Sequence, residues 1–219
     1  MMVNVTINGR QLTAEEGTTV LYAARANNIS IPTLCENEAV SPYGACRLCL
    51  VEIETARGRQ RLVTSCIYQV EEGLKVETNT EKIRGIRRML LELLLARCPD
   101  SDVIQDMAAE YGLTKTRFRK QKDNHKCILC ANCARTCEEV VGVAAISLSR
   151  RGVDRQMTTP FNEDFTDACI GCGSCAFSCP TGAITMTDKG DTRSLAWPHN
   201  SMEFKLKQCS VCGTYWAPE

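Results

Sequence analysis

The chain has 219 residues, enough for one large domain or two small ones, and 26 basic residues balance 26 acidic residues. This balance does not point to a polyanionic partner such as nucleic acid. The 15 cysteines leave three classes open: a disulfide scaffold, zinc modules or iron–sulfur ligands. The first ten residues lack a signal-peptide pattern, and the apolar stretch 89–96 is too short to cross a bilayer. A reducing cytoplasm is therefore the predicted compartment.

Residues 1–79 predict a small α+β domain in which one helix packs across a mixed sheet. Residues 2–13 read as a hairpin around Asn8-Gly9, a pair that supplies the positive φ angles of a tight turn. A helix is predicted over 20–27, and short strands are predicted at 50–53, 61–64 and 74–78.

Residues 80–123 predict a helical linker, because glycine and proline are scarce and apolar residues recur at helical spacing. A second helix is expected over 102–111, ended by Gly112. The first helix carries an apolar stripe, interpreted as a core-packing face, with a docking face for a partner as the alternative. The apolar stripe consists of Ile83, Ile86, Leu90, Leu93 and Leu94. The basic residues of this helix are expected to form a solvated face, and they are Lys82, Arg84, Arg87 and Arg88.

Residues 124–190 contain two cysteine runs with the same spacing, and the second run ends in Cys-Pro. Gaps of two, two and three residues are typical of bacterial ferredoxins, and paired zinc knuckles have a different pattern. The insertion 141–165 between the runs predicts a hairpin around 150–152, and the tail 191–219 is expected to be irregular. The two runs are Cys127, Cys130, Cys133 and Cys137, and Cys169, Cys172, Cys175 and Cys179.

The fourth cysteine of each run is expected to ligate the cluster of the other run, because it lies past a helical turn and points away. This crossing makes the two clusters close neighbours. The predicted ligand sets for the two 4Fe–4S clusters are Cys127, Cys130, Cys133 and Cys179, and Cys137, Cys169, Cys172 and Cys175.

A third set consists of Cys35, Cys46, Cys49 and Cys66. A close pair, with one cysteine upstream and one well downstream, suits a 2Fe–2S cluster, although the gaps differ from the usual plant spacing. A zinc site is the alternative, since irregular spacing is less specific.

With these motifs the chain resembles a known family. The strings GACRLCLVEI and SCIYQVEEGLKVET, with the two ferredoxin runs, are similar to the N-terminal part of the large iron–sulfur subunit of respiratory complex I. They are still more similar to the small diaphorase subunit of NAD-linked hydrogenases and formate dehydrogenases. The resemblance implies a β-grasp ferredoxin-like domain, a helical linker and a two-cluster ferredoxin domain. It also implies a flavin-containing, NADH-handling partner subunit.

The chain departs from this family in the linker. The family usually carries a further 4Fe–4S site there, bound by one histidine and three cysteines, whereas this chain has only Cys98 near the expected histidine. We therefore expect that fourth cluster to be absent.

Three cysteines remain: Cys98, Cys209 and Cys212. The close pair in the tail is typical of half a zinc site, which Cys98 and either His125 or His199 could complete. An additional iron–sulfur cluster, simple thiols and a site shared with a partner are the alternatives.

No nucleotide-binding glycine motif, P-loop or nucleophile with a base is found in the sequence. We therefore predict an electron-transfer subunit of a soluble oxidoreductase complex, without a substrate-converting site of its own. The resemblance implies a hydrogenase or formate dehydrogenase type, in which single electrons pass between the flavin subunit and a catalytic subunit, with bifurcation left open. A free multi-cluster ferredoxin or redox sensor is one alternative, and a structural zinc scaffold is another.

Overall fold

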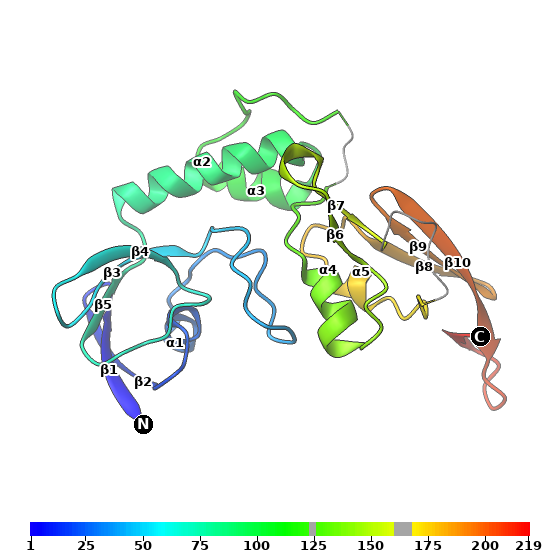
Figure 1. Cartoon of the computed structure of the whole chain (residues 1–219), viewed down its shortest axis with the longest axis horizontal. Coiled ribbons are helices and arrows are strands. Elements are labelled where there is room, and N and C mark those ends of the chain that lie inside the picture. The colour runs from blue at the N-terminus through cyan, green and yellow to red at the C-terminus, as the bar shows by residue number, and fades with distance from the viewer. Residues whose placement is uncertain (123–125, 160–167) are drawn as a thin grey trace. The chain divides into compact units, whose positions relative to one another are not determined.

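The computed structural model of the chain describes residues 1–122, 126–159 and 168–219 (Figure 1). The chain forms two compact units. The first unit comprises residues 1–36, 42–96 and 104–119, and the second comprises residues 37–41, 97–103 and 120–219.

The first unit is built on a five-stranded sheet in the order β2-β1-β5-β3-β4. β1 and β5 run parallel, and the other neighbouring strands run antiparallel, so the sheet is mixed as predicted. The strands are β1 (Met2–Ile7), β2 (Arg10–Glu15), β3 (Leu50–Glu54), β4 (Gln60–Thr64) and β5 (Leu74–Glu77).

Helix α1 (Val20–Ala26) supplies the other half of the core of this unit. Thr19 caps it by accepting the backbone N–H of Tyr22 at 3.4 Å. Its Val20 and Leu21 are fully buried and share one apolar cluster with inward-facing residues of the sheet. The hairpin turn also forms where predicted, with positive φ angles at the two residues between β1 and β2. The predicted helix across a mixed sheet is therefore confirmed.

Two helices follow, α2 (Glu81–Arg97) and α3 (Asp102–Glu110). The predicted solvated basic face of α2 is wrong at Arg87, which is buried with 2% of its surface exposed. The predicted apolar stripe is shifted as well, because Leu93 is 45% exposed while Leu91 and Leu95 are buried. The buried face of α2 repeats every four residues and includes an arginine because that arginine binds two backbone carbonyl oxygens beneath the helix.

The second unit contains short helices, a hairpin and a sheet of its own. The hairpin expected between the cysteine runs forms as β6 and β7, which pair antiparallel, while the end of that predicted segment, at 160–165, lies outside the described residues. The helices are α4 (Asn132–Arg135), the π-helix η1 (Thr136–Val140), the 3-10 helix η2 (Gly152–Asp154) and α5 (Ser174–Phe177), and the hairpin strands are β6 (Ser147–Ser149) and β7 (Gln156–Thr158).

The expectation of an irregular tail is wrong. Residues 185–218 form an antiparallel four-stranded sheet in the order β11-β10-β9-β8 (Figure 1). Alternate residues of β9 point inward and are buried, and these are Arg193, Leu195 and Trp197. This alternation gives the tail a core face. The strands are β8 (Thr185–Lys189), β9 (Thr192–Trp197), β10 (Asn200–Gln208) and β11 (Tyr215–Pro218).

Candidate iron–sulfur sites

The four cysteines predicted for the 2Fe–2S cluster lie together beside the sheet of the first unit. The Sγ atoms of Cys49 and Cys66 are 3.4 Å apart, and Cys35 Sγ accepts the backbone N–H of Cys46 at 3.3 Å. Three of the four cysteines are almost fully buried, and Cys46 is half-buried. Two close pairs of thiols are the arrangement that two irons with two thiolates each require.

The thiols of this set cannot all ionise without a compensating positive charge. Hydrogen bonding with Cys35 lowers the pKa of Cys46 to about 6, and hydrogen bonding with Cys66 lowers the pKa of Cys49 to about 7. The same hydrogen bonds, followed by burial, raise the pKa values of Cys35 and Cys66 well above the ordinary range. One thiol of each pair therefore stays protonated in the protein alone. A cationic metal core would allow all four to bind as thiolates, so the donor set fits such a group.

Arg87 holds the backbone on both sides of Cys49. Its Nε donates to the carbonyl oxygen of Leu48 at 2.8 Å, and one Nη donates to the carbonyl oxygen of Leu50 at 2.8 Å. Two bonds from one planar guanidinium fix the position of the peptide groups between them. Sequence reasoning missed this role, because the residue lies among three other basic residues of the same helix.

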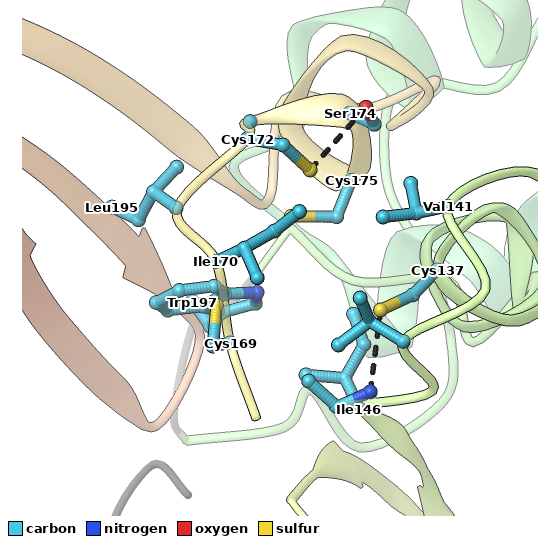
Figure 2. A pocket seen from close by; sticks show the side chains of 13 residues that line it. Cys137, Val141, Ile146, Cys169, Ile170, Cys172, Ser174, Cys175, Leu195 and Trp197 are labelled. Carbon is cyan, nitrogen blue, oxygen red and sulfur yellow. Dashed lines mark hydrogen bonds between the residues drawn. The ribbon is translucent and has the colours of Figure 1, made fainter. Parts of the chain in front are cut away.

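The first of the two other sets surrounds a hollow in the second unit (Figure 2). Its wall includes Cys169, Cys172 and Cys175 of the second run, together with Cys137 of the first run. Apolar side chains complete the wall, among them Ile146, Ile170, Leu195 and Trp197.

A second hollow lies in the same unit. It is lined by Cys127, Cys130 and Cys133 of the first run and by Cys179 of the second run. Leu148, Met157 and Ile184 are among the apolar residues around it. Each hollow therefore takes three thiols from one run and the fourth from the other, and binding of clusters by these two sets stays a prediction.

Short helices produce this crossing. α4 and η1 follow Cys130 and carry Cys137 away from the hollow that contains the start of its own run. Backbone N–H groups then point at the crossed sulfurs, from Ala145 to Cys137 Sγ at 3.3 Å and from Ala183 to Cys179 Sγ at 3.2 Å. Hydrogen bonds of this kind stabilise thiolate ligands and influence the potential of a bound cluster.

Burial disfavours thiolates in both hollows when no metal is present. Desolvation raises the pKa of Cys175 to about 12 and raises the pKa of Cys133 well above its ordinary value. Within the described residues, no three His, Cys, Asp or Glu side chains converge on one point as ligands of a single ion would. In a 4Fe–4S cluster each thiolate binds a different iron, so four thiols spread around a hollow fit a cluster better than a mononuclear ion.

Cys209 and Cys212 are hydrogen-bonded to each other, but within the described residues Cys98 does not join them in one group. Cys98 is fully buried, and its thiol donates to the carbonyl oxygen of Cys127 at 3.1 Å. Burial, with a smaller contribution from Cys127, raises the pKa of Cys98 to about 12, so its thiol is neutral. Cys209 and Cys212 lie in the turn between β10 and β11, with Cys212 exposed. The described residues thus give no geometric support to a zinc site or cluster shared by these three, and His125 lies outside those residues.

Two family models match the chain. Residues 1–81 match a "2Fe-2S iron-sulfur cluster binding domain", and residues 164–185 match a "4Fe-4S binding domain". The first match includes all four cysteines of the 2Fe–2S set, and the second includes the four cysteines of the second run. The chain therefore contains a 2Fe–2S domain and a 4Fe–4S domain.

Similarity to several known proteins extends over more of the chain. One subunit of the NADH-quinone oxidoreductase of Rhizobium meliloti is 37% identical over 97% of this chain and 27% of its own length. The alpha subunit of the NADPH-Fe(3+) oxidoreductase of Geobacter sulfurreducens is 37% identical over 84% of this chain and 24% of its own length. The chain thus spans about a quarter of the length of these relatives.

A solved structure is also similar. A chain in the crystal structure of NAD+-reducing [NiFe]-hydrogenase in the H2-reduced state aligns with a TM-score of 0.63 and 28% identity. The alignment covers 72% of this chain and 75% of that one. These relatives confirm the resemblance to iron–sulfur subunits of complex I and NAD-linked hydrogenases. In the described parts of the chain, none of the helices has the length and apolar character needed for a membrane crossing.

Proposed function

We propose that the chain is an iron–sulfur electron relay within a multisubunit NAD(P)-linked oxidoreductase of the hydrogenase or formate dehydrogenase type. Electrons would pass singly between a flavin-containing, NADH-handling subunit and a catalytic subunit, in a reducing compartment such as the cytoplasm. The chain would have no substrate-converting site of its own. The observation that carries this proposal is the pair of hollows, each lined by thiols from both cysteine runs.

The proposed cofactors are one 2Fe–2S cluster and two 4Fe–4S clusters. The 2Fe–2S cluster would be held by a β-grasp domain, for which the helix over a mixed five-stranded sheet is support. The 4Fe–4S clusters would be held by a two-cluster ferredoxin domain, and the crossed partition of the cysteines supports their close spacing. When bound, such clusters supply one-electron redox chemistry over a wide range of potentials.

The residues around these sites would orient the clusters and exclude water. Trp197 and Leu195 of the tail sheet close one hollow with apolar surface. Backbone N–H groups donate to cysteine sulfurs in the 2Fe–2S set and in both hollows. Arg87 fixes the peptide groups beside Cys49. Hydrogen bonds, burial and local charge are the means by which a protein sets cluster potentials.

Metal analysis of anaerobically purified protein tests the proposal. The three clusters predict about ten iron and ten sulfide per chain, as two, four and four of each. Cys46→Ser should abolish only the 2Fe–2S signal in electron paramagnetic resonance (EPR) spectra. Cys212→Ser is the matched control, because this cysteine is exposed and lies outside the three sets. Folded protein that is nearly free of iron would contradict the proposal.

The free-ferredoxin alternative makes a different prediction. A free carrier would purify as a lone monomer and reduce unrelated enzymes, whereas a subunit would co-purify with a flavin-containing partner when the neighbouring genes are co-expressed. The similarity to subunits of larger assemblies favours the second outcome.

A further inference from the structure

Each cysteine run in the second unit has an arginine bound to its backbone. Arg97 Nε donates to the carbonyl oxygen of Cys127, the first cysteine of the first run, at 3.2 Å. Arg193 Nη1 donates to the carbonyl oxygen of Gly171, between Cys169 and Cys172 of the second run, at 3.1 Å. A positive charge is thus held close to each hollow.

The two arginines differ in their charged partners. Arg193 forms a two-point ion pair with Asp188, in which Nε and Nη2 donate to the two carboxylate oxygens at 2.8 Å each. The Arg193 side chain is 10% exposed and the Asp188 side chain is 38% exposed, so the pair joins a buried cation to a carboxylate that water reaches. The other hydrogen bond of Arg97 goes to the carbonyl oxygen of Arg155 at 3.0 Å. Among residues 1–122, 126–159 and 168–219, no carboxylate forms an ion pair with Arg97.

A neighbouring charge acts on a cluster through the charge that reduction adds. An oxidised 4Fe–4S cluster with four thiolates is formally about −2, and one electron makes it about −3. A cation near the cluster stabilises the reduced form more than the oxidised form, and this raises the reduction potential. A cation whose charge is cancelled by an adjacent carboxylate has a much smaller effect.

We propose that Arg97 raises the reduction potential of the cluster at Cys127, Cys130, Cys133 and Cys179, whereas Asp188 cancels most of the corresponding effect of Arg193 at the other cluster. The two 4Fe–4S sites, each lined by four cysteines, are thereby made electrostatically unequal. Arg97 and Asp188 act on the clusters through their charges, because neither residue supplies a ligand. The inference rests on the proposed function, since it requires both clusters to be present.

The substitutions must separate charge from structure. Arg193 also donates to the carbonyl oxygen of Trp216 at 3.3 Å, so replacing it would disturb the tail sheet. Asp188→Asn is preferable, because an asparagine oxygen can still accept from Arg193 while the negative charge is removed. Arg97→Gln removes the positive charge of that side chain, and Arg97→Lys keeps it. Arg151→Gln is the control, because Arg151 is exposed in the same unit.

The test is a redox titration of the full chain with its clusters, followed by EPR spectroscopy. Arg97→Gln should lower the midpoint potential of one 4Fe–4S cluster, and Arg97→Lys should lower it less. Asp188→Asn should raise the midpoint potential of the other cluster, and Arg151→Gln should shift neither. Unchanged potentials in Arg97→Gln and Asp188→Asn, at full iron content, would overturn the inference, as would shifts confined to one cluster.

Two further results remain decisive. If Arg97→Gln fails to retain its iron, Asp188→Asn alone decides: a raised potential at one 4Fe–4S cluster supports the inference, and an unchanged potential overturns it. If the unsubstituted protein contains no 4Fe–4S clusters, the proposed function itself fails, and iron analysis identifies that case before any titration.

Discussion

Arg87 offers a sharp test of how the first unit holds its candidate cluster. Arg87→Met keeps an unbranched side chain in the buried face of α2 but removes both hydrogen bonds to the carbonyl oxygens of Leu48 and Leu50. A hydrogen bond from a charged donor contributes about 1.5–3 kcal/mol, and an unsatisfied buried acceptor costs about 1–3 kcal/mol. The bond to the Leu50 carbonyl oxygen is only partly buried, so water can replace the arginine there in part. We therefore expect the two losses together to lower the free energy of unfolding by about 3 kcal/mol.

Release of the 2Fe–2S cluster measures this loss. If both bonds break before the cluster leaves, about 3 kcal/mol corresponds to a release rate about 150-fold higher. The visible circular dichroism of the cluster, followed after transfer to a fixed urea concentration, gives the half-life. The EPR signals of the 4Fe–4S clusters in the same sample report on the second unit.

Arg88→Met is the matched control for this experiment. It removes the same charge from the neighbouring position of the same helix, where the side chain is exposed. We expect its cluster half-life to stay within about twofold of the unsubstituted protein, since surface substitutions usually change stability by less than about 0.5 kcal/mol. Equal half-lives for the two variants would refute the anchoring role of Arg87.

Two other substitutions test the second unit. Gly171 has a φ of +62°, and an added Cβ would lie 2.8 Å from the ring of Phe204. Gly171→Ala should therefore lower the iron content, counted by metal analysis, by about four per chain. The double variant Gly171→Ala/Phe204→Ala should recover part of this iron. Cys98→Ala should leave the iron and zinc contents unchanged and lower stability by about 1 kcal/mol, because the neutral thiol only donates to the carbonyl oxygen of Cys127. Loss of metal in Cys98→Ala would instead revive the zinc hypothesis.

The cysteine sets were the part of the site that sequence could predict. Gaps of two residues limit three thiols to one loop, and a fourth cysteine beyond a helical turn cannot return to the same hollow. The crossing of Cys137 and Cys179 follows from this local geometry, and the structure arranges the thiols accordingly. Spacing contains no comparable information for Cys98 and the tail pair, because a contact between distant segments depends on the fold as a whole.

The phase of α2 could not be predicted from its apolar residues alone. Arg87 stands where the buried repeat of Ile83, Leu91 and Leu95 requires an inward-facing residue. An arginine at that position is conventionally assigned to solvent, which moves the predicted stripe toward Leu93, a half-exposed residue. The two acceptors that explain the arginine, the carbonyl oxygens of Leu48 and Leu50, lie at the start of β3, far away in sequence.

The tail sheet was missed for a related reason. β9 alternates as a strand with one buried face should, yet the first inward residue is Arg193, between Leu195 and the turn at Gly190. The alternation of Leu195 and Trp197 alone is too short to distinguish a strand from irregular chain. Recognition of the strand would have required knowing that Arg193 pairs with Asp188 across β8 and β9.

These buried arginines share a physical cause. A loop that surrounds a cluster directs backbone N–H groups at sulfur, so its carbonyl oxygens do not find their partners in regular secondary structure, and buried carbonyls need donors. Arginine can reach such carbonyls from a neighbouring element and satisfy two at once, as Arg87 does on either side of Cys49. Arg97 and Arg193 each donate to a backbone carbonyl of one cysteine run in the same way. If clusters bind at these sites, reduction adds negative charge there, and a donor without a neighbouring carboxylate in the described part of the chain, such as Arg97, is then also a charge well placed to set a potential.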